Sequence, residues 1–293
     1  MKVAIFGQYY QNDTRPIIKD IFVFFNRNNV EIVIEEKFLK ILYEEEIVGK
    51  KYNTFSSHKD LDSSFDMLIS IGGDGTILRA VTFVRDSGIP ILGVNAGRLG
   101  FLAKAQKENI ESFIKVIVEK KYSISERTLL TLECSPRATE IEINFAMNEV
   151  SVNRKDTTSM ITVETYLNGE YLNSYWADGL IISTPTGSTG YSLSCGGPIL
   201  TPDVRGIVIT PIAPHNLTAR PLVIPDDTEI KLKVSGREEQ YLVSLDSRIA
   251  SINNNSVLTV KKTPFKIKMV EITEETFFKT LRSKLLWGED KRN

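Results

Sequence analysis

The sequence predicts two domains, an α/β domain followed by a mostly β domain, from three observations. Apolar strands alternate with amphipathic helices up to about residue 121, an order that favours a parallel sheet with helices on its faces. From residue 122 onward, short strands of alternating polarity dominate. At 293 residues the chain is long enough for each domain to bury its own core. We therefore expect an α/β domain at 1–121, a β-rich domain at 122–270, and a C-terminal helix within 271–293 that packs back on the first domain.

The first domain begins with a strand, a helix and a second strand. Lys2 to Gly7 is a short apolar run, and Asp13 is suited to cap the helix that follows. The apolar stripe of this helix comprises Ile17, Ile18, Ile21, Phe22, Phe24 and Phe25. Asn28-Asn29 then turns the chain into Val30 to Glu35, a strand in which Val or Ile alternates with Glu.

A charged segment, Lys37 to Lys51, comes next and is expected to be helical and exposed. Together with the polar stretch Asn53 to Ser64 it forms either a surface excursion or a mobile flap. The alternation of strands and helices then resumes. The expected elements are a strand at Met67 to Ile71, a helix at Thr76 to Val84, a strand at Pro90 to Val94 and a helix at Asn109 to Lys120.

The turn Ile71-Gly72-Gly73-Asp74-Gly75-Thr76 joins the central buried strand to its helix. Three glycines without Cβ atoms let a phosphate approach the backbone N–H groups and the positive end of the helix. A phosphate would repel Asp74, so this carboxylate is expected to hold a metal, to take a proton from an attacking hydroxyl or to bind sugar hydroxyls. Each of these roles points to phosphoryl transfer.

Gly and Asp are also the residues that ordinary turns use, and the run alone would favour a plain turn. Its position favours a ligand-binding role over a plain turn, because ligands of α/β sheets bind at the carboxyl ends of strands. The end of the next strand carries a second glycine-bearing turn, Asn95 to Leu102. Within it, Phe101 is either a plug for the core below or a ring that stacks on a base.

The second domain is predicted as a series of short strands with a hairpin turn at Asn168-Gly169, followed by a late helix at Thr273 to Leu286. The expected strands are Ser123 to Cys134, Glu140 to Val152, Met160 to Leu167, Leu180 to Thr184, Ile207 to Ile212, Glu229 to Val234, Tyr241 to Leu245, Arg248 to Ile252 and Ser256 to Lys262.

One loop of the β region departs from strand chemistry. Thr184 to Ser192 holds five Ser/Thr hydroxyls, two glycines and one aromatic residue, a set of neutral donors that suits sugar hydroxyls, a base edge or a diphosphate. A hydrophilic β-turn cluster explains the same composition equally well. Asn148-Glu149 interrupts an apolar strand and, like Asp178, must be hydrogen-bonded within the fold or face a ligand. His215, alone in a Pro-bounded loop, is interpreted as a structural hydrogen-bonding residue.

The composition argues against several classes of function. Lys plus Arg is 36 against 37 for Asp plus Glu, a balance that gives no support for a nucleic-acid partner. No run approaches the ~20 apolar residues of a membrane helix, and the first residues are too short for a signal peptide, so no membrane partner is expected. The histidines are few and Cys134 and Cys195 lie far apart, so we expect no structural zinc site and reduced thiols in a cytoplasm.

The sequence resembles the NAD kinases, which phosphorylate the 2′-hydroxyl on the adenosine ribose of NAD. The Gly-Gly-Asp-Gly element alone is shared with diacylglycerol kinases, sphingosine kinases and phosphofructokinases, whereas Asp178 through Pro198 makes the resemblance specific. The matching motifs follow the family's order over most of the chain beyond residue 65. They are Gly72-Gly73-Asp74-Gly75-Thr76, Asn95 to Leu102, Asn148-Glu149, Asp178 to Pro198 and Pro214 to Pro221.

The resemblance implies a Rossmann-like α/β first domain and a β-sandwich-like second domain, with the site in the cleft between them. Asp74 would be the general base, Gly75 would line the same spot, and Arg79 would lie near phosphate charge. Mg²⁺ is expected with ATP, since the chain has no P-loop lysine motif; no protein side chain is assigned to it. The remaining contacts to NAD would come from Phe101 and Tyr191 near the adenine, Asn148 and Glu149 at ribose and base, Asp178 at the nicotinamide end, and Thr189, Gly190, Ser192, Leu193, Ser194, Ala213 and Arg248.

The sequence departs from the family's pattern at three places. Trp176 stands where relatives often have Arg, Gly190 replaces a frequent Ala, and Asp246-Ser247-Arg248 stands where Asp-Gly-Gln is common, which leaves the ligand role of Arg248 open. Two other functions are considered beside the NAD kinase. A lipid kinase shares the first motif, but the chain shows no basic amphipathic helix for a membrane; a non-catalytic dinucleotide sensor would not need Asp74. The resemblance also implies a homodimer or homotetramer.

Overall fold

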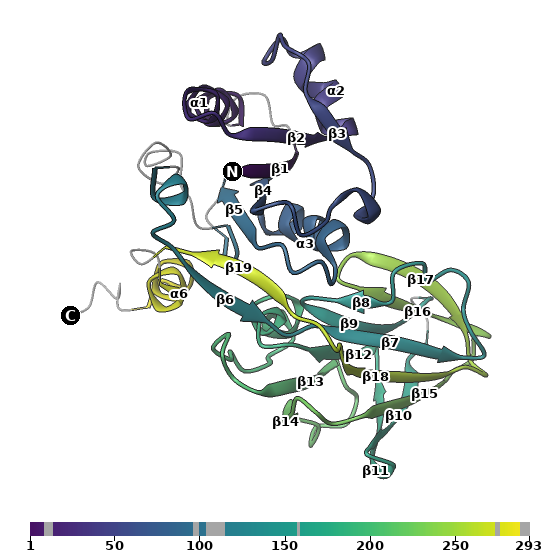
Figure 1. The fold of residues 1–293 in the computed structure, drawn as a ribbon. Helices are drawn as coiled ribbons and strands as arrows, with labels where there is room; N and C mark the ends of the chain where they lie inside the picture. Colours follow the sequence, from purple (N-terminus) through teal and green to yellow (C-terminus); the bar gives the residue numbers. More distant parts are fainter. Residues whose placement is uncertain (9–13, 96–99, 104–114, 157–158, 273–275, 288–293) are drawn as a thin grey trace. The chain divides into compact units, whose positions relative to one another are not determined.

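The computed structural model describes residues 1–8, 14–95, 100–103, 115–156, 159–272 and 276–287 (Figure 1). The chain divides into two compact units, unit 1 with residues 1–126 and 267–293 and unit 2 with residues 127–266. Unit 1 is an α/β domain and unit 2 is mostly antiparallel β, which confirms the predicted fold class. The unit boundaries lie a few residues from the predicted 121/122 and 270/271. The reason is that β6 (Ser123–Arg127) and β19 (Ile267–Glu271) both belong to the sheet of unit 1.

The sheet of unit 1 has, within the described residues, seven strands in the order β3-β2-β1-β4-β5-β19-β6 (Figure 1). All pairings from β3 to β19 are parallel, as the alternation of strands and helices predicts. The other strands of this sheet are β1 (Lys2–Gly7), β2 (Glu31–Glu35), β3 (Asn53–Phe55), β4 (Met67–Gly72) and β5 (Ile91–Asn95). Because β1, β4 and β5 are central and parallel, their carboxyl ends form one edge, and the glycine turn lies there.

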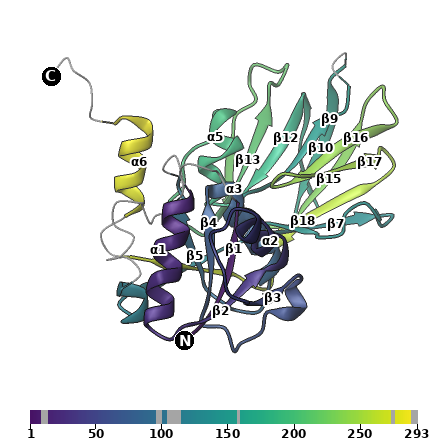
Figure 2. The ribbon, with the colours of Figure 1, turned by 90° about the horizontal axis from the view of Figure 1, so that it is seen from above.

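Helices cover both faces of this sheet, and Figure 2 shows α1 alongside its strands. The described helices are α1 (Thr14–Arg27), α2 (Glu36–Glu44), α3 (Asp74–Val84) and α6 (Phe277–Leu285). Residues of α1 and α2 share one buried apolar cluster with one face of the sheet. On the other face, Phe83 of α3 contacts the rings of Phe6 and Phe55 at 5.3 and 5.5 Å between centroids. No helix in these described ranges is long and apolar enough to span a membrane.

Several predicted helix features have only partial counterparts. The stripe of α1 is buried as expected except for the half-buried Phe24, while the proposed cap Asp13 lies outside the described residues. Of the helix expected at Asn109 to Lys120, residues 115–118 are helical and 109–114 are not described. The late helix begins at Phe277 with Thr276 as its cap, whose hydroxyl accepts the N–H of Lys279.

The segment predicted as an exposed helix and a polar excursion is part of the core of unit 1. Helix α2 buries Phe38, Leu39 and Leu42 and ends at Glu44, well short of Lys51. The Glu35 carboxylate caps it by accepting the N–H of Phe38 at 2.8 Å. Beyond α2, strand β3 adds an edge to the sheet, and Phe55 is only 2% exposed. Seven of the fifteen residues from Lys37 to Lys51 are charged and seven are apolar, and the prediction of exposure rested on the charges alone.

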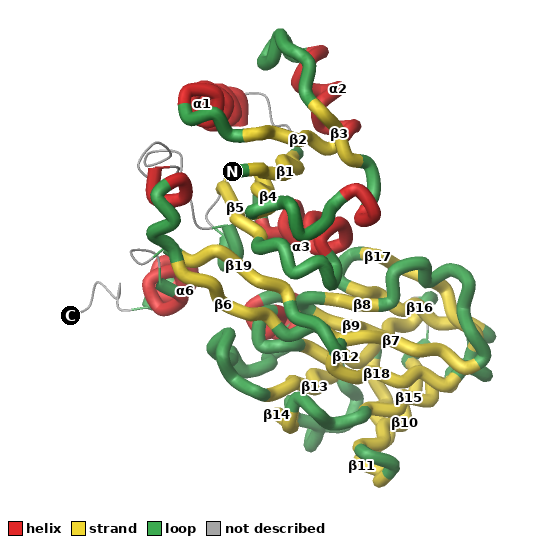
Figure 3. The backbone as a smooth tube through the Cα atoms, viewed as in Figure 1, coloured by secondary structure: helices red, strands yellow, loops and turns green. Residues whose placement is uncertain are grey.

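Unit 2 contains two six-stranded antiparallel sheets among its described residues, drawn in yellow in Figure 3. Their orders are β11-β10-β15-β18-β7-β8 and β14-β13-β12-β9-β16-β17. The strands are β7 (Leu130–Ser135), β8 (Phe145–Ala146), β9 (Glu149–Arg154), β10 (Ile161–Leu167), β11 (Glu170–Ala177), β12 (Gly179–Ser183), β13 (Gly206–Ile212), β14 (Leu222–Pro225), β15 (Ile230–Ser235), β16 (Gln240–Leu245), β17 (Arg248–Asn253) and β18 (Val257–Lys262).

Two of the predicted strands of the β region are divided in the structure. The run from Ser123 to Cys134 forms β6 in unit 1 and β7 in unit 2, and the run from Glu140 to Val152 forms only β8 and β9, with Met147 and Asn148 between them. The hairpin turn is confirmed. Asn168 and Gly169 have φ values of 51° and 87°, the left-handed conformation that an Asn-Gly hairpin turn requires.

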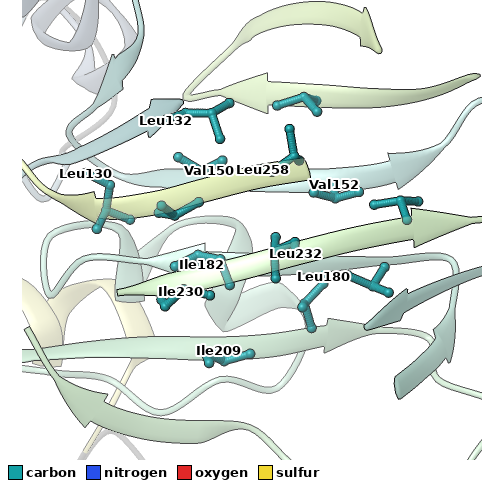
Figure 4. Close-up of a cluster of buried hydrophobic side chains, with 14 of the residues drawn as sticks. Leu130, Leu132, Val150, Val152, Leu180, Ile182, Ile209, Ile230, Leu232 and Leu258 are labelled. Carbon is teal, nitrogen blue, oxygen red and sulfur yellow. The ribbon is translucent and has the colours of Figure 1, made fainter. Parts of the chain in front are cut away.

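The two sheets pack face to face as a β-sandwich. Their inner faces supply one cluster of buried aliphatic side chains, among them Leu132, Val152, Ile182 and Leu232 (Figure 4). Alternate residues of each strand point inward, as the period-2 pattern predicts. Each such side chain contributes about 1.5–3 kcal/mol on burial, so this layer holds the loops of unit 2 on a rigid base.

Replacing Tyr241 by Phe tests the packing of this core. Tyr241 is fully buried, and its hydroxyl has no hydrogen-bond partner in the part of the chain that the structure describes. A buried hydroxyl without a partner lowers stability, so Tyr241→Phe is expected to leave the free energy of unfolding unchanged or to raise it by up to ~1 kcal/mol. Urea denaturation measures the difference. A loss of more than ~1 kcal/mol would show that the hydroxyl has a partner in solution.

Candidate active site

The glycine turn lies between β4 and α3, at the carboxyl edge of the sheet of unit 1. Gly72 has a φ of 151°, and a Cβ there would lie 2.3 Å from Oγ1 of Thr76, so only glycine fits. Gly73 precedes the first turn of α3, and its carbonyl accepts the N–H of Thr76 at 3.0 Å. A Cβ at Gly73 or Gly75 would meet nothing within 4 Å. The turn is therefore tight on its inner side and open where its last glycines lie.

Asp74, in the first turn of α3, is held by three backbone donors. Its Oδ2 accepts the N–H of Phe101 at 2.7 Å, and its Oδ1 accepts those of Leu102 and Ala103 at 3.1 and 3.2 Å. An ionised carboxylate has about four acceptor positions. Among the described residues three are used, and the one left lies on Oδ2. The carboxylate is thus fixed in orientation while it can still accept one further proton or hydrogen bond.

Gly100 leaves the room that this carboxylate needs. A Cβ at Gly100 would lie 1.9 Å from Oδ1 of Asp74. We expect Gly100→Ala to rotate the Asp74 carboxylate away from its three donors and to lower kcat by at least about tenfold, since a base must be placed within hydrogen-bond reach of its proton. Steady-state kinetics and circular dichroism would be measured together. An unchanged kcat in a folded variant would contradict this account of Asp74.

The other predicted site residues of unit 1 lie around the same edge. Arg79 is exposed, with its guanidinium 5.6 Å from the centroid of the Phe6 ring, and it lines a hollow of about 530 Å³ at the ends of β1 and β2. The ring of Phe101 packs against Phe277 of α6 at 6.2 Å between centroids. This contact supports the interpretation of Phe101 as a plug, while its stacking on adenine stays a prediction.

In unit 2, Asn148 and Glu149 lie at the start of β9 and are fixed by Asp246. The carboxylate of Asp246 accepts the N–H groups of Met147, Asn148 and Glu149 at 3.1, 2.7 and 3.4 Å. Oδ1 of Asn148 and Oε2 of Glu149 are buried and have no hydrogen-bond partner among the described residues. Burial and the nearby Asp246 raise the pKa of Glu149 to about 8. Both side chains therefore have hydrogen-bonding capacity that the described fold leaves unused.

The loop from Thr184 to Ser192 uses most of its hydroxyls within the fold, which favours the hydrophilic turn cluster, one of the two alternatives that its composition left open. Thr184 donates to the carbonyl of Met147 at 2.6 Å, Ser188 to that of Pro185 at 2.7 Å, and Ser192 pairs with Thr210 at 2.8 Å. Thr189 donates to the carbonyl of Thr186. An irregular buried loop must satisfy its backbone groups locally, and these hydroxyls do so.

This loop brings the remaining predicted residues close to Glu149. It continues through η3 (Gly187–Thr189) into the short helix α5 (Tyr191–Ser194). A Cβ on Gly190 would lie 3.5 Å from Oε2 of Glu149 and 3.6 Å from Nδ2 of Asn148. Tyr191 is 42% exposed, and its pKa is raised by burial and by the charges of Cys195, Asp178 and Glu149. Ser194 is exposed and Leu193 half-buried. The structure thus gathers Asn148, Glu149, Asp178, Gly190 and Tyr191.

Asp178 lies between β11 and β12 and pairs with Arg154, a residue that the sequence did not single out. Its Oδ1 lies 3.1 Å from Nε of Arg154, and its N–H donates to the carbonyl of Ile212, which places Ala213 nearby. Ala213 is exposed with a φ of 43°. Trp176, 50% exposed, packs against the ring of His215 at 4.2 Å, and the His215 N–H donates to the Trp176 carbonyl, in keeping with a structural role for His215.

Arg248 contacts the backbone that precedes Asn148 and Glu149. Its guanidinium donates to the carbonyls of Ile143 and Phe145 and lies 3.5 Å from Oδ2 of Asp246. In the sequence, Asp246 is noted only within the motif Asp246-Ser247-Arg248, which departs from the family's pattern, and no role is predicted for it. An Asp in a two-residue turn between two predicted strands has a carboxylate that can accept backbone N–H groups, and this position is the signal that could have drawn attention to it.

An Asp-bearing glycine turn at the edge of a parallel sheet, together with an antiparallel sandwich that carries a polar loop, is the combination expected of a two-domain phosphotransferase that acts on an alcohol group. Family comparison agrees. Residues 3–122 match the ATP-NAD kinase N-terminal domain, and residues 147–272 match the ATP-NAD kinase C-terminal domain.

Similar proteins that match this chain over nearly its full length are NAD or NADH kinases. Proteins named NAD kinase from Flavobacterium johnsoniae and Flavobacterium psychrophilum are 75% and 73% identical, each aligned over 100% of both chains. An NAD kinase from Archaeoglobus fulgidus in complex with ATP superposes with a TM-score of 0.74 at 27% identity, over 98% of this chain and 99% of that one. Yeast NADH kinase complexed with NADH shares the fold, with a TM-score of 0.87 at 22% identity over 100% of this chain and 89% of that one. The chain belongs to the NAD kinase family.

Proposed function

We propose that this protein transfers the γ-phosphate of ATP to the 2′-hydroxyl on the adenosine ribose of NAD, with Asp74 as the general base. The observation that carries the proposal is the Asp74 carboxylate, oriented by three N–H donors with an acceptor position left on Oδ2. Asp74 takes the proton of the 2′-hydroxyl as its oxygen attacks the γ-phosphorus. The bond from that phosphorus to the bridging oxygen breaks, and ADP leaves with the electron pair, giving NADP and ADP.

The residues gathered in unit 2 would hold the acceptor. Asn148 and Glu149 have buried polar atoms without partners, which suits them to the ribose and the base. Tyr191 offers an exposed aromatic ring for stacking near the adenine, and Asp178 would bind the nicotinamide end. Ser192 would contribute through its backbone, since its hydroxyl is paired with Thr210.

The donor would enter as ATP carrying Mg²⁺ on its phosphates. The described residues contain no group of three His, Cys, Asp or Glu side chains that would hold a metal, so the ion would come with the nucleotide. Arg79 is exposed on α3 one turn beyond Asp74, a position suited to phosphate charge. The glycine turn would accept the phosphates against its open backbone and the N-terminus of α3.

A coupled assay tests the proposal. Purified protein is incubated with NAD, ATP and Mg²⁺, and NADP is followed with an NADP-specific dehydrogenase. Sustained NADP formation supports the proposal. Tight NAD binding without turnover would instead establish a dinucleotide sensor, and phosphorylation of a diacylglycerol or sphingoid base with none of NAD would establish a lipid kinase.

We further propose a cytoplasmic homodimer or homotetramer. The two cysteines are free thiols, which suits a reducing compartment. The resemblance to a family whose members commonly assemble supports the oligomer. Light scattering after size exclusion would give the mass of the particle, and a value near the 33.0 kDa of one chain would overturn the oligomer.

A further inference from the structure

One turn of unit 2, between β16 and β17, holds the Asn148-Glu149 corner from two sides. The side chain of Asp246 is only 4% exposed and accepts three successive N–H groups, those of Met147, Asn148 and Glu149. Arg248, two residues on, donates one nitrogen to the carbonyl of Ile143 at 3.0 Å and the other to that of Phe145. The two side chains also lie 3.5 Å apart. Backbone groups of the corner and of the segment that precedes it are therefore fixed by one charged pair.

The two carboxyl groups at this corner have different surroundings. Burial raises the pKa of Asp246, but three N–H groups and Arg248 favour its charged form. Oε2 of Glu149 has no partner among the described residues, and burial and the charge of Asp246 raise the pKa of Glu149. Tyr191, whose pKa is also raised, is the other titratable group here affected by Glu149. Burial disfavours the charged form of both groups, and Asp246 has three N–H donors and Arg248 to stabilise its charge, so the proton belongs on Glu149.

We propose that Asp246 and Arg248 are positioning residues that fix the Asn148-Glu149 corner and make Glu149 a neutral hydrogen-bond donor to the dinucleotide. The proposal rests on the proposed function, because it takes NAD as the ligand of this corner. A protonated carboxyl donates through its O–H, so its partner is an acceptor such as a purine ring nitrogen or a ribose oxygen. A charged Glu149 would lack this donor and would repel the diphosphate of the ligand.

The first experiment compares Glu149→Gln with Glu149→Ala by calorimetric titration of NAD into the full-length protein. An amide is neutral and donates, so Glu149→Gln is expected to keep the Kd for NAD within about threefold, whereas Glu149→Ala weakens binding by about tenfold or more, ~1.4 kcal/mol. In the wild type, affinity is expected to be constant at neutral pH and to fall as pH rises through about 8, where Glu149 loses its proton. Glu149→Gln should remove this fall.

The second experiment replaces the two positioning residues, Asp246 and Arg248, one at a time. Burial raises the pKa of Glu149 most, and the Asp246 charge adds to it. Asp246→Asn removes that charge and one acceptor of the corner's N–H groups, so the loss of affinity should move to lower pH, and the Kd at pH 7 should rise while kcat at saturation changes less. Arg248→Gln keeps one donor for the Ile143 or Phe145 carbonyl and should give a smaller rise, while Arg248→Ala gives a larger one. Glu239→Gln, an exposed carboxylate of the same unit, is the control and should match the wild type.

The outcomes separate two failures. If the wild type neither binds nor phosphorylates NAD, the proposed function fails. If the wild type is active but Glu149→Gln binds NAD as weakly as Glu149→Ala, the neutral donor is wrong. If Asp246→Asn and Arg248→Ala are folded by circular dichroism and keep the wild-type Kd and pH profile, the positioning role is wrong.

Discussion

Asp74→Asn is expected to lower kcat for NADP formation by about 10²–10⁴-fold while the Kd for NAD changes by no more than a few fold. The size of the loss is that of a positioned general base. An amide oxygen accepts hydrogen bonds but is far too weak a base to take the proton of the 2′-hydroxyl. In addition, both carboxylate oxygens face N–H donors, so the amide NH₂ must be turned toward one of them. The coupled assay at saturating NAD and ATP measures kcat, and calorimetry measures binding.

The matched control is Asp86→Asn, because Asp86 is an exposed carboxylate that closely follows the same helix. It should behave as the wild type in both measurements. If Asp74→Asn keeps kcat within about threefold of the wild type, Asp74 is not the base. A loss of NAD binding equal to the loss of kcat/KM would instead assign Asp74 to substrate binding.

Gly187→Ala is expected to lower kcat/KM for NAD by about 100-fold. A Cβ at residue 187 would lie 2.1 Å from the carbonyl oxygen of Asn148 and 2.5 Å from its carbonyl carbon. Those are backbone atoms, and they are held by the N–H of Thr184 and by Asp246. Neither side can yield without moving the Asn148-Glu149 corner, and a factor of 100 corresponds to ~2.7 kcal/mol. Overpacking of this kind costs about 1–3 kcal/mol or more.

Gly206→Ala is the control for this substitution. Gly206 lies in β13 of the same unit, and a Cβ there would meet nothing closer than 3.4 Å. Both variants are compared by kcat/KM and by the free energy of unfolding from urea denaturation. The comparison separates the general effect of replacing a glycine from the effect of the contact between residue 187 and the backbone of Asn148. Wild-type kcat/KM in Gly187→Ala would show that the loop and the corner are not in contact in solution.

Much of the fold was predictable because it is encoded locally. Apolar periodicity gave most strands of the sandwich, and Asn168-Gly169 gave the hairpin. The predictions that were wrong concern elements whose place depends on residues distant in the sequence. Whether Ser123–Arg127 joins one sheet or the other depends on pairing with β19, more than 140 residues later in the chain, a partner that no local pattern indicates. Helix α2 has four charged residues among its nine, and its local pattern does not tell that Phe38, Leu39 and Leu42 are buried in the core of the unit.

The same contrast between local and distant signals explains which residues of the candidate site could be predicted. Asp74 was predictable, since a strand, a glycine turn and a helix are consecutive in the sequence. The hydroxyls of Thr184, Ser188 and Ser192 were not, because composition does not tell whether a hydroxyl bonds a ligand or the carbonyl of its own loop. Asp246 and Arg248 act on a strand about a hundred residues earlier, so their role appears only when the two segments are seen side by side.

The position of β19 also sets an order for biosynthesis. Because β19 lies between β5 and β6, and follows unit 2 in the chain, the sheet of unit 1 stays incomplete until residue 271 has been made. By then all strands of unit 2 have been synthesised, and chains generally fold by units as they emerge. During that interval β5 presents an unpaired strand edge, the kind of surface that recruits other chains. A nascent chain stalled before β19 is therefore the form most exposed to misassembly and to chaperones.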